Sequence, residues 1–182
     1  MKSKFYERTV KRQCVYKGRI INVENLVVKM PAGNFAQREV VRHPGAVTII
    51  GITKDKKIVL IRQFRKPVEE EIWEIPAGLV KKGESDRQGA IREFKEETGY
   101  RVRRMRQILS GYVSPGYSSE LLKYFLATGL TKAEANTDED ELIDVFEIPI
   151  KQAVKWVKSG KIKDNKTIIG ILLAKDINGS TR

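Results

Sequence analysis

The sequence contains very little cysteine and histidine: Cys14 and His43 are the only examples in 182 residues. A single cysteine permits no internal disulfide, which is typical of proteins from a reducing cytosol. With so few soft ligands, a zinc site is not expected. We interpret Cys14 as a small strand residue, and His43 as a turn or core residue rather than a ligand or base.

Long apolar segments are also missing. The longest, around residues 46–52 and 168–174, are far shorter than the ~20 residues needed to span a bilayer. The charged N-terminus has no apolar core of the kind found in signal peptides, and there is no low-complexity linker or internal repeat. We therefore expect a soluble cytoplasmic protein without a membrane partner, of a length that suits one hydrophobic core.

The net charge of +12 arises from 35 basic and 23 acidic residues. This excess suits a polyanionic substrate, and it also suits RNA. The basic residues are dispersed, however, and the densest group, residues 101–106, would be divided between two faces of a strand. No RNA-stacking aromatic motif accompanies it. We interpret these residues as solvated surface, with an electrostatic funnel as the alternative, and do not expect a nucleic-acid partner.

One stretch, residues 78–100, carries most of the functional information. It contains a pattern of seven fixed glycine, glutamate and arginine positions: Gly78, Glu84, Arg92, Glu93, Glu96, Glu97 and Gly99. At background frequencies, this pattern would match by chance in about one window in 10⁸.

A helix is predicted within this stretch, over residues 86–98. Ser85 and Gln88 are spaced as a capping box, and Gly99 is a natural helix stop. At about 100° per residue, one side of the helix should face the core. That side consists of Ala90, Ile91, Phe94 and Thr98.

The adjoining side of the predicted helix is acidic. Glu93, Glu96 and Glu97 are spaced i, i+3 and i+4, so they repel one another, and only Arg92 is placed to offset them. A bound Mg²⁺ would turn that repulsion into ligation, because it prefers hard oxygen ligands and commonly bridges carboxylates to substrate phosphates. A solvated acidic face is the alternative, but the spacing, caps and glycines together favour a metal site.

The rest of the chain alternates between predicted strands and helices. Apolar and polar positions alternate through the first ~45 residues, with a turn over residues 30–34. Further strands are expected at 46–53, 58–64, 100–112, 121–128 and 142–148, and helices after Pro149 and over 166–175. This order predicts an α/β/α sandwich over residues 44–182, preceded by an antiparallel β-subdomain over 1–43.

The seven-position pattern resembles the signature of the Nudix hydrolases, which cleave pyrophosphates attached to a nucleoside. Tyr100 departs from the aliphatic residue preferred there. Three further segments resemble the ADP-ribose pyrophosphatase branch: Arg62–Arg65, Glu74–Gly78, and Ser114–Gly116, whose Pro115 follows Gly99 by 16 residues. The resemblance implies Mg²⁺-dependent hydrolysis of ADP-ribose to AMP and ribose 5-phosphate by a metal-activated water, with Mn²⁺ as an alternative ion.

The resemblance also implies roles for individual residues. The metal ligands would be the Ala77 carbonyl and the carboxylates of Glu93, Glu96 and Glu97. Glu96 and Arg92 would belong to the catalytic set, with Arg92 pairing with Glu84 or Glu96 to fix the loop against the helix. Glu120 matches the general base of similar enzymes, whereas the acidic cluster Asp138–Glu141 is the rival source.

Substrate binding requires an aromatic plane for adenine and cations for phosphate. The candidates are Arg65, Phe64, Gln63, Arg42, Tyr16 and Pro115. Alternation along a regular strand would place Phe64 and Arg65 on opposite faces, so both could serve one site only if the strand ended there. In this branch the N-terminal subdomain is exchanged across a homodimer, and a dimer is expected because isolated hairpins are only marginally stable.

Other functions fit the sequence less well. GDP-mannose or another nucleoside diphosphate sugar could replace ADP-ribose with an unchanged catalytic set. A non-hydrolysing regulator that binds ADP-ribose would be favoured by the loss of signature carboxylates, and all are present. RNA 5′-end pyrophosphohydrolase activity suits the positive charge, but the Ser114–Gly116 segment and the N-terminal strands argue against it.

Overall fold

The structure is a computed structural model that describes residues 3–133 and 142–179. The chain divides into two compact units. The first comprises Met1–Gly45 and Gly111–Leu122, and the second comprises Ala46–Ser110 and Lys123–Arg182. The first unit thus takes in segment 111–122, which the sequence does not assign to the N-terminal subdomain.

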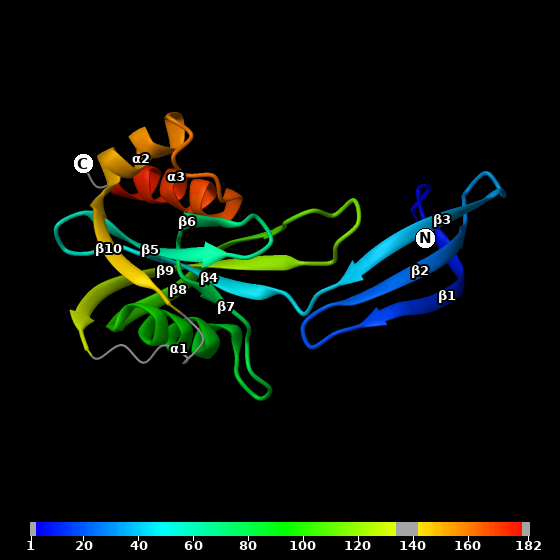
Figure 1. Ribbon diagram of the computed structural model, residues 1–182, viewed down its shortest axis with the longest axis horizontal. Helices are drawn as coiled ribbons and strands as arrows, with labels where there is room; N and C mark the ends of the chain where they lie inside the picture. The colour runs from blue at the N-terminus through cyan, green and yellow to red at the C-terminus, as the bar shows by residue number, and fades with distance from the viewer. Residues whose placement is uncertain (1–2, 134–141, 180–182) are drawn as a thin grey trace. The chain divides into compact units, whose positions relative to one another are not determined.

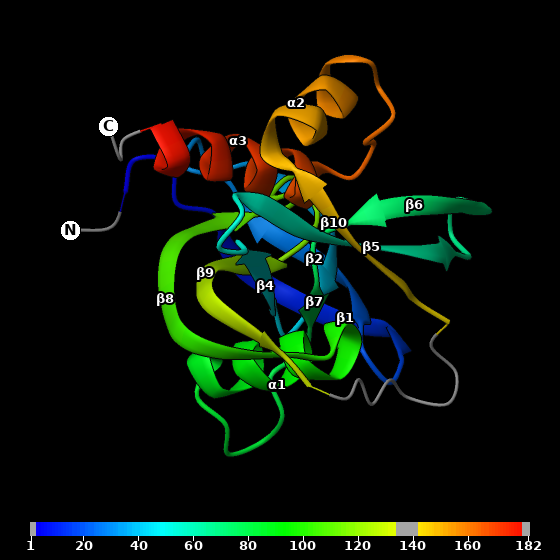
Figure 2. The same cartoon turned by 90° about the vertical axis from the view of Figure 1, so that its left-hand side faces the viewer.

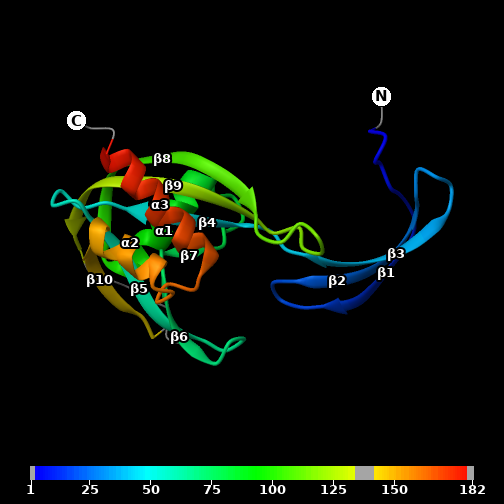
Figure 3. The same ribbon diagram turned by 90° about the horizontal axis from the view of Figure 1, so that it is seen from above.

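The first unit contains a three-stranded antiparallel sheet (Figure 3). Its strands β1 (Arg8–Lys17), β2 (Asn22–Lys29) and β3 (Phe35–Arg42) lie in the order β1-β2-β3. Between β2 and β3, the Met30 N–H donates to the Asn34 carbonyl at 2.8 Å, and Gly33 has a φ of 96°, which favours glycine. The predicted turn over residues 30–34 is therefore confirmed.

Segment 111–122 is hydrogen-bonded to β3. The Val41 N–H donates to the Tyr117 carbonyl at 2.8 Å, and the Ser119 N–H donates to the Val41 carbonyl at 3.0 Å. The Ser119 hydroxyl also accepts a hydrogen bond from the His43 N–H at 3.0 Å. The segment that carries Glu120 is therefore attached to the end of β3.

The second unit contains two sheets. One has the order β7-β4-β9-β8, formed by β4 (Ala46–Gly51), β7 (Ala77–Gly78), β8 (Tyr100–Tyr112) and β9 (Leu121–Lys132), the last two with ends in the first unit. The other has the order β10-β5-β6, formed by β5 (Lys57–Arg65), β6 (Glu70–Glu74) and β10 (Asp144–Pro149). β5 is antiparallel to both neighbours.

Helices cover these sheets on both sides. Figures 1 and 2 show α1 (Asp86–Thr98) on one side, and α2 (Ile150–Lys158) and α3 (Asn165–Gly179) on the other. One core cluster, between α1 and the sheets, consists of Val47, Ile49, Val59, Ala90, Phe94, Tyr100, Met105, Phe125 and Ala127. Gly51 permits this packing, because a Cβ there would lie 2.4 Å from Phe94 Cζ. The α/β/α sandwich is confirmed.

Most predicted elements are present, with shifted ends. The helix over 86–98 is confirmed, whereas the last helix begins at Asn165 and continues to Gly179. Ala77 and Gly78, which lie outside the strands expected from the sequence, pair with Thr48 and Val47 as the short strand β7. None of the helices among residues 3–133 and 142–179 is long and apolar enough to cross a membrane.

Candidate active site

Two caps fix the position of the acidic helix α1. The Ser85 hydroxyl accepts a hydrogen bond from the Gln88 N–H, and the Gln88 side chain accepts one from the Ser85 N–H, as in a capping box. At the other end, Gly99 has a φ of 67°, and its N–H donates to the Lys95 carbonyl. The rotation of the helix, and hence the direction of its acidic side, is set by these local contacts and by the buried Phe94.

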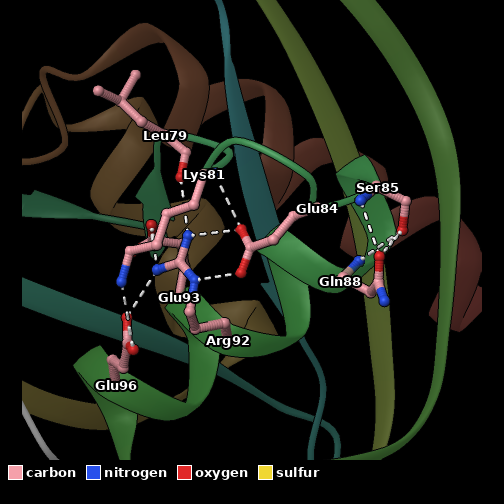
Figure 4. Close-up of polar contacts among 8 residues, drawn as sticks. All are labelled: Leu79, Lys81, Glu84, Ser85, Gln88, Arg92, Glu93 and Glu96. Carbon is pink, nitrogen blue, oxygen red and sulfur yellow. Dashed lines mark hydrogen bonds and ion pairs between the residues drawn. The ribbon is translucent and has the colours of Figure 1, made fainter.

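Arg92 lies at the centre of the acidic residues (Figure 4). Its Nε donates to Glu84 Oε1 at 2.8 Å and its Nη2 to Glu84 Oε2 at 3.0 Å. Nη1 donates to Glu93 Oε1 at 2.7 Å and to Glu96 Oε2 at 2.8 Å, and Nη2 also reaches the Leu79 carbonyl. Arg92 thus fastens loop 79–84 to the helix, in agreement with the expected pairing with Glu84 and Glu96.

This cluster changes the acidity of its members. The Arg92 guanidinium, together with a hydrogen bond from the Lys81 N–H, lowers the pKa of the Glu84 carboxyl to about 2. The same hydrogen bond to Glu84 raises the pKa of Arg92. Burial instead raises the pKa of the Glu93 carboxyl, although Arg92 opposes that effect. The ionised form of Glu93 therefore carries a free-energy cost of burial, and a nearby cation would reduce that cost.

Gly78 makes room for the Glu93 carboxylate. A Cβ at residue 78 would lie 2.2 Å from Glu93 Cδ, closer than any real contact. The Glu93 side chain is 15% exposed. A side chain at residue 78 would force this carboxylate to shift, whereas glycine leaves it in place beside strand β7.

Glu97 lies one helical turn beyond Glu93 and reaches the same strand. It is 5% exposed, and its Oε2 accepts a hydrogen bond from the Ala77 N–H at 3.2 Å. Two carboxylates of α1 therefore meet the backbone of β7. The contact at Ala77 is made through its N–H, so metal ligation by its carbonyl stays a prediction.

The donor chemistry here suits a hard divalent cation. Glu93 and Glu97 offer oxygen ligands beside β7, with Glu96 adjacent to them on the helix. In the described residues no three acidic, histidine or cysteine side chains already form a ligand cluster, and Arg92 holds Glu93 Oε1 and Glu96 Oε2. A cation would compete with Arg92 for these oxygens.

Arg65 projects from the end of β5 in the same unit. It donates to both oxygens of Glu74, Nε to Oε1 at 2.6 Å and Nη2 to Oε2 at 2.8 Å. The pKa of Arg65 is raised mainly by this hydrogen bonding, and the charge of Glu97 adds to the effect. Arg65 therefore lies within electrostatic range of Glu97.

Phe64 and Arg65 occupy successive positions of β5, which continues through Arg65, so their side chains are directed to opposite faces. Phe64 is 53% exposed, and Gln63 is half-buried. Sequence reasoning named Glu74 only as the first residue of the segment Glu74–Gly78 and gave no role to this carboxylate, which is 1% exposed. The one signal in the sequence that could have indicated its burial is its position between two apolar residues, Trp73 and Ile75, at the end of a strand.

The remaining candidates belong to the first unit. Arg42 Nε donates to Glu24 at 2.8 Å, Tyr16 is 57% exposed on β1, and Pro115 is exposed. Glu120 is half-buried, with Oε1 3.9 Å from His43 Nδ1. The rival cluster Asp138–Glu141 lies outside the described residues.

Comparisons with known proteins identify the family to which this fold and its acidic helix belong. The crystal structure of an ADP compounds hydrolase matches all of this chain with a TM-score of 0.87 at 22% identity, and all of that chain is covered, which establishes a shared fold. A profile of the NUDIX domain matches residues 42–168. The chain therefore belongs to the Nudix family, whose members are hydrolases that act with divalent metal ions.

Curated relatives extend over most of the chain. A methanol dehydrogenase activator from Bacillus methanolicus is 43% identical, over 92% of this chain and 91% of the relative. An ADP-ribose pyrophosphatase from Bacillus subtilis is 40% identical, over 91% and 90%. A GDP-mannose pyrophosphatase from Escherichia coli is 37% identical, over 72% and 77%.

Proposed function

We propose that the chain hydrolyses the pyrophosphate bond of ADP-ribose to give AMP and ribose 5-phosphate. The observation that carries this proposal is the convergence of Glu93 and Glu97 on β7, with Arg65 nearby. In this proposal Glu93 and Glu97 would be ligands of a cation, and the Arg65 guanidinium would bind phosphate beside them. The substrate itself is supported by the Bacillus subtilis relative, which is named for ADP-ribose.

The acidic side of α1 is the proposed metal site. Glu93 and Glu97 would be the main ligands, with Glu96 and the Ala77 carbonyl completing the set, and Mg²⁺ is the preferred ion with Mn²⁺ as the alternative. A divalent ion held there would lower the pKa of a water and neutralise phosphate charge. Arg92 keeps Glu84 and its loop in place while these carboxylates bind.

The chain itself supplies the remaining groups. Arg65 would bind a phosphate oxygen, because its guanidinium is anchored by Glu74 and remains 42% exposed. Glu120 is the proposed general base, with a cluster member of Asp138–Glu141 as the alternative. Arg42, Tyr16 and Pro115 are proposed for the nucleoside end.

We further propose a homodimer formed through the N-terminal strands, in a cytoplasmic enzyme. All ten residues of β1 are exposed, and they include Val10, Val15 and Tyr16, which are 44%, 49% and 57% exposed. β1 is an edge strand that carries these apolar side chains among four basic ones, and an exposed edge strand can pair with another chain. A second copy would cover it and form a two-fold symmetric assembly.

GDP-mannose is the second candidate substrate, because a relative at 37% identity is named for it. The relative at 43% identity is named for its effect on another protein, so its name does not choose between substrates. A non-hydrolysing regulator remains the alternative outside the enzyme class.

A hydrolysis panel tests the proposal. The purified chain with Mg²⁺ is offered ADP-ribose, GDP-mannose, diadenosine polyphosphates and triphosphorylated RNA at equal concentrations. We expect the highest kcat/KM for ADP-ribose, with AMP and ribose 5-phosphate formed in equal amounts. Faster cleavage of GDP-mannose would select the second candidate, and binding of ADP-ribose without turnover would select the regulator.

A further inference from the structure

Glu74 is an almost fully buried carboxylate that contacts two cations. It lies at the end of β6, is 1% exposed, and accepts hydrogen bonds from both Nε and Nη2 of Arg65. Lys166, near the start of α3, donates to Glu74 Oε2 from the other direction. Although burial alone would raise the pKa of Glu74, the two cations hold it below its usual value.

The two cations differ in what else they can reach. Lys166 is 14% exposed and also donates to Asp164 at 3.0 Å, so it is enclosed within the protein. Arg65 is 42% exposed. Glu74 uses the Nε edge of the guanidinium, which leaves the two N–H groups of Nη1 and one on Nη2 for other acceptors. Arg65 therefore has both a buried edge and an edge that a ligand can use.

Stability alone does not explain this arrangement. Replacing a buried ion pair by apolar residues of similar volume is often neutral or stabilising. A long arginine that is half exposed, by contrast, loses rotamer entropy when it binds a ligand unless it is already fixed. A buried bidentate partner fixes it in advance and sets the plane of the guanidinium.

We propose that Glu74 is a positioning residue that holds the Arg65 guanidinium in the orientation that binds the pyrophosphate of the substrate. This rests on the proposed function only in taking a pyrophosphate as the ligand of Arg65. Glu74 does not itself touch the substrate. Lys166 serves a separate purpose: it attaches α3 to Glu74, and it only adds to the effect of Arg65 in keeping that carboxylate ionised.

A purely structural role for Glu74 is the competing explanation. The start of α3 is also attached to Ile75, directly after β6, because the Ile75 N–H donates to the Thr167 hydroxyl at 2.7 Å and that hydroxyl donates to Asp164. If Glu74 only completed this attachment, its loss would lower stability, and any loss of pyrophosphate affinity would occur with or without Arg65. If Glu74 orients Arg65, the loss of phosphate affinity should depend on Arg65.

A double-mutant cycle separates these explanations. The dissociation constant of inorganic pyrophosphate is measured by calorimetry with Mg²⁺ present, for wild type, Glu74→Gln, Arg65→Gln and the double variant. We expect each single variant to weaken binding roughly tenfold or more, and the double variant to be no weaker than Arg65→Gln. This readout requires no turnover, so it is independent of whether ADP-ribose is the substrate hydrolysed.

Three further variants make the result decisive. Glu71→Gln, an exposed acid on the same strand, should leave pyrophosphate affinity unchanged, and Lys166→Met should lower the melting temperature with less than threefold loss of affinity. If Glu74→Gln does not fold, Glu74→Asp withdraws the charge by about 1.5 Å and should still weaken binding.

Three results would overturn the proposal. The folded Glu74 variants could bind pyrophosphate with wild-type affinity, the losses of affinity from the two single variants could add up in the double variant, or wild type could fail to bind pyrophosphate.

Discussion

The Arg92 guanidinium binds both carboxylate oxygens of Glu84, with Nε 2.8 Å from Oε1 and Nη2 3.0 Å from Oε2. Glu84 lies in the loop before α1, and Arg92 lies two turns into the helix. This pair joins the loop to the helix, and Arg92 also neutralises part of the charge of Glu93 and Glu96.

Arg92→Gln should therefore lower thermal stability, because three carboxylates lose a shared cation. In a domain of this size each kcal/mol lost corresponds to roughly 2–4 °C in Tm. Thermal unfolding monitored by circular dichroism measures the change. Arg87→Gln is the matched control, since Arg87 lies on the same helix and donates to the Met105 carbonyl instead. Equal losses in the two variants would contradict the role given to Arg92.

The Glu84–Arg92 pair should also make stability depend on pH. The folded-state pKa of Glu84 is about 2, below its ordinary value of 4.5. A depressed pKa contributes stability that is complete above the ordinary value and is lost as the pH falls toward the folded value. The difference in Tm between wild type and Glu84→Gln should thus shrink between about pH 5 and pH 2. A difference that stays constant over this range would show that the pair does not contribute.

Helix α1 was predictable to the residue because its signals are local. Ser85, Gln88 and Gly99 form caps with neighbours in the sequence, so their spacing alone determines both helix ends. The pairing of Arg92 was predictable for the same reason, since Glu96 lies one turn away and Glu84 is in the adjacent loop.

The features that sequence reasoning missed depend on distant parts of the chain. Ala77 and Gly78 form a strand because Thr48 and Val47 pair with them. Glu74 stays ionised although it is buried, because Lys166, 92 residues later, adds a second cation to Arg65. No local pattern marks such partners. The opposite faces of Phe64 and Arg65, by contrast, followed directly from strand alternation.

The proposed base is tested by Glu120→Gln. If Glu120 accepts the proton of the attacking water, kcat should fall by ~10²–10⁴ while KM stays nearly unchanged. The acidic limb of the pH–rate profile should disappear in the variant. Glu39→Gln, which replaces an exposed acid on β3, is the control. The same kinetic change in Glu139→Gln or Glu141→Gln, but not in Glu120→Gln, would assign the base to the later cluster.

The proposed dimer is tested by removing residues 1–42. The truncated chain should be monomeric by light scattering and should bind ADP-ribose much more weakly. Because β3 holds segment 111–122, turnover should be lost as well, whereas α1 should still bind metal. Val15→Lys on β1 should weaken the dimer without altering β3. A full-length chain that is monomeric and fully active at micromolar concentration would contradict the assembly.

The most direct test of the account is ADP-ribose turnover by Glu97→Gln and Glu93→Gln in saturating Mg²⁺. Wild type should release AMP and ribose 5-phosphate, and the Glu97 variant, followed by the Glu93 variant, should lose ~10²-fold or more in kcat. Without metal, the Tm of both variants should stay the same or rise, because like-charge repulsion on α1 is relieved. Glu71→Gln should retain full activity. Near-wild-type kcat in both helix variants would contradict the assignment of this acidic helix as the metal-binding catalytic centre.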